Sequence, residues 1–278
     1  MTIVRYWQEN PVPQELVDVL AQSRFPLALT GAGISVPSGI PDFRSADGLW
    51  TMFDPLEYAT LRVFQRDPGK AWLLYRALGE TLEGKQPNTA HKALAKLEQL
   101  PWLRGLITQN IDGLHQSAGS EQCLEIHGTH HWVHCLECSF QRPMEANDLR
   151  RMPYPCCPVC EAPLKPNIVL FGESVHRMEE VEYLAAQADL LLVIGTSCAT
   201  YPAADIPSTV HRKGGVILEF NLASCLGESV PSGLTRFFFP GNVTKSLPFF
   251  VDQVKRVQAS AGSVAADRPH SGELSRNV

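Results

Sequence analysis

Short apolar runs and amphipathic stretches alternate along most of this chain. Between residues 88 and 100, apolar side chains recur at the three- and four-residue spacing that is typical of a helix packed by one face. Apolar runs that end near Gly, Asn or Thr fall at residues 25–30, 105–108, 189–194 and 216–220. Short buried strands that alternate with helices predict an α/β fold, in which a parallel sheet carries helices on both faces.

Two stretches depart from this rhythm. Residues 131–165 are rich in Cys and Pro and lack a helical period, which predicts a small inserted module. The remainder, at about 14–130 and 166–256, is expected to form the large part of the same single domain. From about residue 259 to 278 the chain is small, polar and aperiodic, and we expect a disordered tail.

Composition narrows the class of protein. The chain has 278 residues with 44% apolar positions, enough for one sizeable core with a small insert. A net charge of −5 gives no electrostatic case for direct nucleic-acid binding. The first residues, MTIVRYWQENP, do not resemble a secretory signal, and no apolar run is long enough for a membrane span. We expect an intracellular, cytoplasmic protein without membrane contact.

Five of the eight cysteines lie between residues 135 and 160. Cys135 and Cys138 form one C-x-x-C pair, and Cys157 and Cys160 form another. Four thiolates at this spacing close a tetrahedral Zn²⁺ shell and leave no open position, so the sequence predicts a structural rather than a catalytic zinc site. Cys156 is an alternative ligand to Cys157, although the 157/160 spacing is better.

Polar and glycine residues collect just after four of the predicted strands. The stretch GAGISVPSGIPDFRS, at residues 31–45, follows the first, and Gly195-Thr196-Ser197 follows another. Residues 108–112 (TQNID) and Asn221 follow two more. Open α/β sheets bind ligands at such strand ends, and a glycine-rich turn before a helix suits phosphate. The G-x-G alone is equally typical of a plain turn. The prediction of a ligand site therefore depends on all four groups occurring together.

These motifs occur together in a familiar order. GAGIS, GIPDFRS, TQNID, LEIHG, the two C-x-x-C pairs, KPNIVLFGE, GTS and FN resemble the sirtuins, the NAD-dependent protein lysine deacylases, over residues 16–254. The resemblance implies a Rossmann-like sheet domain with a small zinc-binding domain, and NAD and acyl-lysine meeting in the cleft between them.

The resemblance also implies a role for each motif. Residues 31–45 would form the flexible loop over NAD, while residues 109–112 would face its ribose, pyrophosphate and nicotinamide. The GTS motif and FN would hold the adenosine half. The implied cofactor-binding residues are Gly31, Ala32, Gly33, Ser35, Asp42, Phe43, Arg44, Gln109, Asn110, Ile111, Asp112, Gly195, Thr196, Ser197 and Asn221.

His127 in LEIHG would be the general base, with Asn110 as a second catalytic residue. An imidazole titrates near neutral pH and can take a proton from a ribose hydroxyl. In the implied mechanism the acyl oxygen displaces nicotinamide from the ribose, and His127 then activates a ribose hydroxyl. The products would be free lysine, nicotinamide and O-acyl-ADP-ribose. A structural histidine is the alternative interpretation.

The strip KPNIVLFGE is similar to the edge on which the family's substrate peptide adds as a strand, through Val169, Phe171, Gly172 and Glu173. Sirtuins that remove succinyl or malonyl groups resemble one another in a Tyr-x-x-Arg pair. Here Tyr75 is followed by Leu78, so we expect neutral acyl groups.

The chain departs from the family pattern after GTS, where residues 198–203 read CATYPA. This departure leaves the substrate preference less defined than the use of NAD. Two rival functions remain: a protein mono-ADP-ribosyltransferase at the same NAD site, and a non-catalytic module that binds acylated lysine. The second is weakened because Asn110, Asp112 and His127 are all present.

Overall fold

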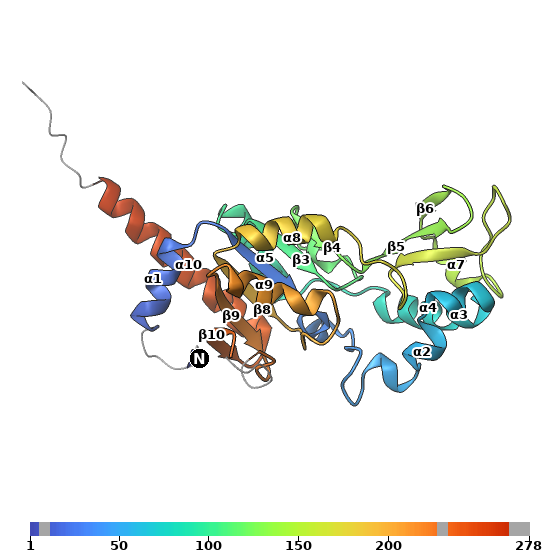
Figure 1. The fold of residues 1–278 in the computed structure, drawn as a ribbon, viewed down its shortest axis with the longest axis horizontal. Helices are drawn as coiled ribbons and strands as arrows, with labels where there is room; N and C mark the ends of the chain where they lie inside the picture. The colour runs from blue at the N-terminus through green and yellow to red at the C-terminus, as the bar shows by residue number, and fades with distance from the viewer. Residues whose placement is uncertain (6–11, 227–232, 267–278) are drawn as a thin grey trace, which may run out of the picture.

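The chain folds into two lobes of unequal size, joined side by side (Figure 1). The computed structural model describes residues 1–5, 12–226 and 233–266. The larger lobe holds a seven-stranded sheet, and the smaller lobe holds a three-stranded sheet and several short helices.

All seven strands of the large sheet run parallel, in the order β1-β10-β9-β8-β2-β3-β4. Every residue of the central strands β2 and β8 is buried, as expected for a sheet covered on both faces. The predicted α/β fold with a parallel sheet is therefore confirmed. The strands are β1 (Thr2–Ile3), β2 (Pro26–Thr30), β3 (Gly105–Thr108), β4 (Cys123–Glu125), β8 (Leu190–Ile194), β9 (Val216–Asn221) and β10 (Thr235–Pro240).

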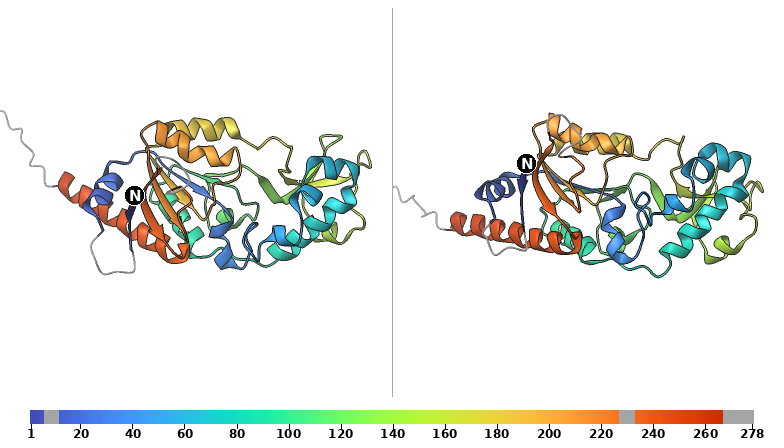
Figure 2. Two further views of the ribbon diagram at one scale, coloured as in Figure 1. Left: turned by 60° about the horizontal axis from the view of Figure 1, so that its bottom comes forward. Right: turned by 90° about the horizontal axis from the view of Figure 1, so that it is seen from below.

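Helices cover the two faces of the sheet as separate layers (Figure 2). α1 (Gln14–Gln22), α5 (Thr89–Gln99) and α10 (Val243–Ala266) pack on one face, where Phe220, Phe239 and Phe250 form the centre of a hydrophobic cluster. α8 (Met178–Gln187) and α9 (Ile206–Arg212) pack on the other face. This layering places the ends of β2, β3, β8 and β9 at one edge of the lobe.

The small lobe is built from two distant segments of the chain. β5 (Gly128–Cys135), β6 (Gln141–Pro143) and β7 (Leu164–Ile168) form an antiparallel sheet, and α7 (Ala146–Arg150) lies between β6 and β7 in the same segment. α2 (Pro55–Tyr58), α3 (Leu61–Arg66) and α4 (Pro68–Leu82) share one hydrophobic cluster with it. The indole N–H of Trp72 in α4 donates to the carbonyl of Leu164, 2.9 Å away, and ties the two segments together.

Short helical turns complete the chain. They are α6 (Leu114–Ser117) and the 3₁₀ turns η1 (Ala32–Ile34), η2 (Val36–Ser38), η3 (Leu49–Thr51) and η4 (Ala203–Asp205). η1 and η2 lie in the glycine-rich stretch after β2. None of the described helices is long and apolar enough to cross a membrane.

The C-terminal helix extends further than the sequence suggested. α10 continues through Ala266, so the first part of the segment expected to be a disordered tail is helical. Ala and Ser at residues 259–266 are compatible with a helix, which the aperiodic polarity of this stretch concealed. The remainder of the predicted tail, residues 267–278, lies outside the described residues.

Candidate active site

Two glycines after β2 allow its loop to press against the loop after β8. A Cβ on Gly31 would lie 2.7 Å from the Thr196 Cβ, and one on Gly33 would lie 2.8 Å from the Gly195 carbonyl oxygen. Gly195 itself has a φ of 56°, a conformation that favours glycine. The Gly33 N–H donates to the Gly195 carbonyl at 2.8 Å. The glycines therefore allow the loops after β2 and β8 to pack closely together. From the sequence, both loops were expected to bind the same cofactor.

The polar side chains at the strand ends hold one another in place. The amide of Gln109 donates to the Thr196 hydroxyl at 2.9 Å, and the amide of Asn221 donates to the Thr196 carbonyl at 2.8 Å. The loop after β2 is connected to the same region, because Arg44 donates to the Thr200 hydroxyl at 2.9 Å. The ends of β3, β8 and β9 thus present a pre-organised polar edge.

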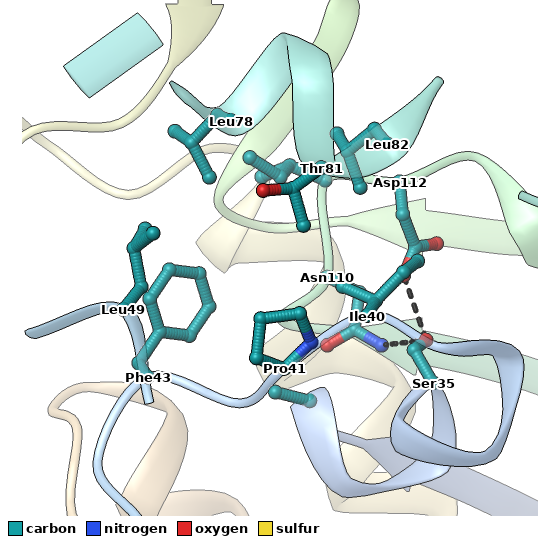
Figure 3. Close-up of a pocket in the computed structure, with 12 residues that line it drawn as sticks. Ser35, Ile40, Pro41, Phe43, Leu49, Leu78, Thr81, Leu82, Asn110 and Asp112 are labelled. Carbon is teal, nitrogen blue, oxygen red and sulfur yellow. Dashed lines mark hydrogen bonds between the residues drawn. The ribbon is translucent and has the colours of Figure 1, made fainter. Parts of the chain in front are cut away.

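Ser35 and Asn110, both buried, form a network with the partly buried Asp112 beneath this edge (Figure 3). The Ser35 hydroxyl donates to Asp112 at 2.7 Å and accepts from the Asn110 amide at 3.2 Å. Both carboxylate oxygens of Asp112 are engaged, since the second accepts the Leu114 N–H at 2.9 Å. These residues line a small cavity of about 30 Å³ whose other wall is apolar, including Phe43 and Leu78.

His127 lies two residues beyond β4 and faces the same region. Its Nδ1 is 3.0 Å from the carbonyl oxygen of Gln109. A carbonyl oxygen only accepts, so Nδ1 carries the proton and Nε2 of the neutral ring is left as a proton acceptor. Burial lowers the pKa of His127, the hydrogen bond to Gln109 raises it, and His176 and Arg44 lower it further. The net pKa is below the usual value, so the ring is neutral at neutral pH and suited to act as a base.

One large cavity of about 760 Å³ brings the predicted site residues together. It is large enough for a dinucleotide-sized ligand together with part of a second molecule. Ser35 and Asp112 line the adjoining small cavity instead. The predicted residues that line the large cavity are Gly31, Ala32, Gly33, Asp42, Phe43, Arg44, Gln109, Asn110, Ile111, His127, Val169, Phe171, Gly172, Glu173, Gly195, Thr196, Ser197 and Asn221.

The strip at residues 169–173 borders this cavity from the small-lobe side. The Val169 N–H donates to the His127 carbonyl at 2.9 Å, so the strip lies directly beside the candidate base. The Phe171 N–H donates to the Ala59 carbonyl, and the Phe171 carbonyl accepts from the Leu61 N–H, at 3.0 Å each. A Cβ on Gly172 would meet nothing within 4 Å, which leaves the end of the strip open.

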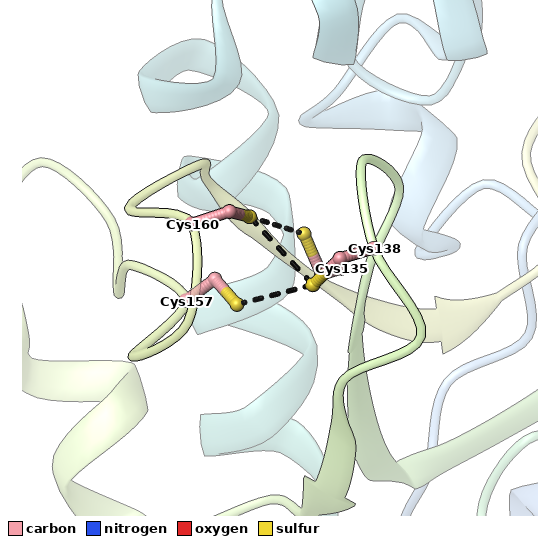
Figure 4. Close-up of side chains that lie close together, drawn as sticks. All are labelled: Cys135, Cys138, Cys157 and Cys160. Carbon is pink, nitrogen blue, oxygen red and sulfur yellow. Dashed lines mark hydrogen bonds between the residues drawn. The ribbon is translucent and has the colours of Figure 1, made fainter.

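Four thiols of the small lobe converge on one point (Figure 4). The sulfur atoms of Cys135, Cys138, Cys157 and Cys160 all lie within 4.8 Å of one another. Neighbouring sulfur pairs are 3.4 to 3.6 Å apart, too far for a disulfide and close to the edge, about 3.8 Å, of a tetrahedral zinc–thiolate shell. Cys156 is exposed and outside this group. The donor set therefore fits structural zinc, with Cys157 rather than Cys156 as the ligand.

Several residues at the site were not found from the sequence. Thr30, at the end of β2, shares a hydrogen bond of 2.8 Å with Thr108 of the TQNID stretch, and His115 contacts Thr30 at 3.0 Å. His91 approaches Ser35 at 3.4 Å from the start of α5. Thr30 could have been inferred, because it is a polar residue at the end of a buried strand. The histidines are brought in by helix packing and left no local signal.

Comparison with known proteins connects this geometry to a family. Residues 31–202 match the sequence profile of the Sir2 family. The chain is 40% identical over 253 residues to an NAD-dependent protein deacylase of Pyrococcus furiosus, covering 87% of this chain and 98% of that protein. It is 44% identical over 208 residues to an NAD-dependent protein deacetylase of Caldivirga maquilingensis, covering 73% and 80%.

Solved structures of Sir2 proteins resemble this chain in fold. A serine-to-alanine variant of a Sir2 homologue in complex with ADP-ribose superposes with a TM-score of 0.83 and 35% identity, over 89% of this chain and 98% of that one. A histidine-to-alanine variant of Sir2, in complex with a deacetylated p53 peptide and 3'-O-acetyl-ADP-ribose, superposes with a TM-score of 0.78 and 33% identity, over 86% and 97%.

Proposed function

Since this chain belongs to the Sir2 family, we propose that it is an NAD-dependent protein lysine deacylase that releases free lysine, nicotinamide and O-acyl-ADP-ribose. The observation that carries the proposal is the shared cavity. The polar strand ends, a neutral His127 and the strip at residues 169–173 all line it. A cofactor and an acylated lysine could therefore meet beside one base.

The large lobe binds the cofactor in this proposal. The closely packed loops after β2 and β8 flank the phosphates, and Ser197 and Asn221 hold the adenosine half. Asn110 and Asp112, fixed through Ser35, face the nicotinamide end. When bound, NAD supplies the ribose carbon that accepts the acyl oxygen as nicotinamide departs.

His127 acts as the general base through Nε2. Its Nδ1–H is committed to the Gln109 carbonyl, which fixes both the tautomer and the direction of the ring. Deprotonation of a ribose hydroxyl needs a neutral imidazole, and burial of His127 favours that form. A positioned base of this kind contributes about 10²- to 10⁴-fold to a rate.

The small lobe receives the substrate. Phe171 already pairs with Ala59 and Leu61, and the Glu173 N–H donates to the Leu170 carbonyl, so an incoming peptide strand would pair chiefly with Gly172 and the carbonyl of Glu173. Cys135, Cys138, Cys157 and Cys160 would hold a zinc ion that stabilises this lobe and has no part in the chemistry.

The acyl group is expected to be uncharged. Tyr75 and Leu78 of α4 line the cavity, and the buried Tyr75 hydroxyl has no hydrogen-bond partner among the described residues. Arg76 turns away and donates to the carbonyls of Leu149, Arg151 and Pro153. An acyl carboxylate beside Tyr75 would therefore find no guanidinium offered by α4. An intracellular, cytoplasmic location stays a prediction from the sequence.

Incubation with an acetyl-lysine peptide, with and without NAD, tests the proposal. The expected result is a loss of the acetyl mass that requires NAD and releases one nicotinamide per lysine. Retention of acetyl together with addition of ADP-ribose to protein would favour the transferase alternative. Binding of the acetylated peptide without any product would favour the non-catalytic alternative.

A further inference from the structure

A lysine lies fully buried behind the substrate strip. Lys165 in β7 is 1% exposed, although lysine is among the residues that are buried least often unless they are paired. Its ammonium is 3.0 Å from a carboxylate oxygen of Glu173 and donates to the carbonyls of Ile168 at 2.7 Å and Pro166 at 3.3 Å. Three acceptors therefore surround three N–H donors.

The carboxylate of Glu173 closes the strip into a turn. The oxygen that meets Lys165 also accepts the Leu170 N–H at 2.7 Å. The Glu173 N–H in turn donates to the Leu170 carbonyl at 2.9 Å. This turn contains Gly172, whose φ is 93°. The ion pair thus holds the carbonyl of Ile168 through Lys165 and the N–H of Leu170 through Glu173, on either side of Val169.

The ion pair is also connected to His127, the candidate base, through hydrogen bonds to the main chain. Lys165 holds the carbonyl of Ile168, and the next residue, Val169, donates its N–H to the carbonyl of His127. A displacement of Lys165 would therefore move the strip at the point where it meets His127.

The surroundings of Lys165 leave Glu173 as its counter-ion. Among the described residues, no carboxylate other than that of Glu173 lies within salt-bridge distance of the Lys165 ammonium. Removing one member of a buried pair is costly, whereas replacing both by apolar side chains of similar size is often tolerated.

We propose that the Lys165–Glu173 ion pair positions the strip at residues 169–173 for the substrate, so that Lys165 is a positioning residue for acyl-lysine peptide binding. This inference rests on the proposed function. The ion pair sets the affinity for the peptide and leaves the affinity for NAD unchanged, because its recorded side-chain hydrogen bonds go to β7 and the strip and none goes to the polar strand ends that the structure describes.

The test uses the double variant Lys165→Met/Glu173→Met, which removes both charges and retains apolar volume. We expect KM for an acetyl-lysine peptide to rise about tenfold, since hydrogen bonds to charged groups are lost from the strip. KM for NAD should change less than about twofold. The control is Glu57→Met/Lys70→Met, which removes an exposed ion pair of similar length, 3.1 Å, in the same lobe.

Hydrogen exchange at the Leu170 amide provides a readout that does not depend on activity. Exchange should be about tenfold faster in the double variant and unchanged in the control. Glu173→Gln, which keeps the shape of the side chain, should accelerate exchange in the same direction should the double variant fold poorly. A wild-type peptide KM and unchanged exchange would overturn the proposal. If the wild-type protein were inactive and the Leu170 amide still exchanged faster in the double variant, the result would contradict the proposed function instead.

Discussion

The two lobes meet at one cavity but are stabilised in different ways. The large lobe buries a parallel sheet between two hydrophobic clusters, and its polar site residues project from the ends of strands. The small lobe has one hydrophobic cluster, assembled from two segments, and adds four converging thiols and the buried Lys165–Glu173 pair. We infer that the cofactor half depends on hydrophobic packing, whereas the substrate half depends on a metal ion and on buried charge.

Loss of the metal should separate the lobes most clearly. In Cys157→Ala the zinc shell cannot close, and structural zinc contributes about 10–16 kcal/mol in small metal-dependent folds. We expect zinc content and deacylation to be lost, with amide protection lost in β5 and β7 and retained in β2, β8 and β9. Mass spectrometry of the intact protein measures the zinc content, and hydrogen exchange measures the amide protection of each strand.

Cys156→Ala is the matched control, because this neighbouring thiol is exposed and outside the cluster. It should keep wild-type zinc content and activity. A Cys157→Ala protein that retained one zinc ion and full activity would refute the dependence of the small lobe on this shell.

A side chain at Gly33 should damage the cofactor half alone. Its Cβ would come within 2.8 Å of the Gly195 carbonyl oxygen, so the loops after β2 and β8 must move apart. For Gly33→Ala we expect KM for NAD to rise on the order of 10²-fold, because small displacements of a positioning loop have effects of this size. The peptide affinity and zinc content should not change.

Gly69→Ala is the control, since a Cβ there meets its neighbours at ordinary distances of 3.4 and 3.5 Å within α4. It should be neutral or slightly stabilising. Equal rises in KM for NAD in both variants would show that the close approach of the loops is irrelevant.

Truncation of the large-lobe core should lower stability without altering the site. Phe220 is fully buried, stacks on Phe239 and packs edge-on to Phe250. We expect Phe220→Ala to reduce the free energy of unfolding by about 3–5 kcal/mol, with zinc content retained. Urea titration of both lobes by fluorescence and hydrogen exchange would measure this loss, and Leu222→Ala, at an exposed position, is the control. An unchanged urea midpoint would contradict the assignment of this core.

The smallest expected effect is on the pH profile. The pKa of His127 is lowered, so the base is lost only as pH falls through that value, and the acid limb of kcat/KM should lie below about 6.5. His176 and Arg44 both lower the pKa of His127. His176→Gln should therefore move the acid limb upward by a few tenths of a pH unit, whereas the exposed His211→Gln should not. A downward shift would reverse the sign of this interaction.

The sequence predicted the two lobes to different extents. The strand ends of the large lobe could be located because each apolar run is followed at once by polar residues or glycine. The double C-x-x-C pattern similarly predicted the metal ligands, including Cys157. The assembly of the small lobe could not be predicted in this way. Its core joins α2–α4 to the later segment that holds β5–β7, through contacts such as that of Trp72 with Leu164, which are 92 residues apart.

Buried polar contacts were the hardest to anticipate. Lys165 and Glu173 stand eight residues apart in a strip that was interpreted as a peptide edge. Nothing in that pattern indicates that a lysine is buried and paired behind the edge. His91 and His115 likewise reach the site through the packing of helices.

Product analysis of His127→Ala tests the central claim most directly. Acetyl-lysine peptide, NAD and enzyme are incubated, and free lysine, nicotinamide and O-acetyl-ADP-ribose are quantified in parallel for the wild-type and variant proteins. The account predicts equal amounts of all three products from the wild type, and a rate at least about 10²-fold lower from a variant that remains folded and zinc-loaded. Formation of O-acetyl-ADP-ribose by His127→Ala at the wild-type rate would contradict it.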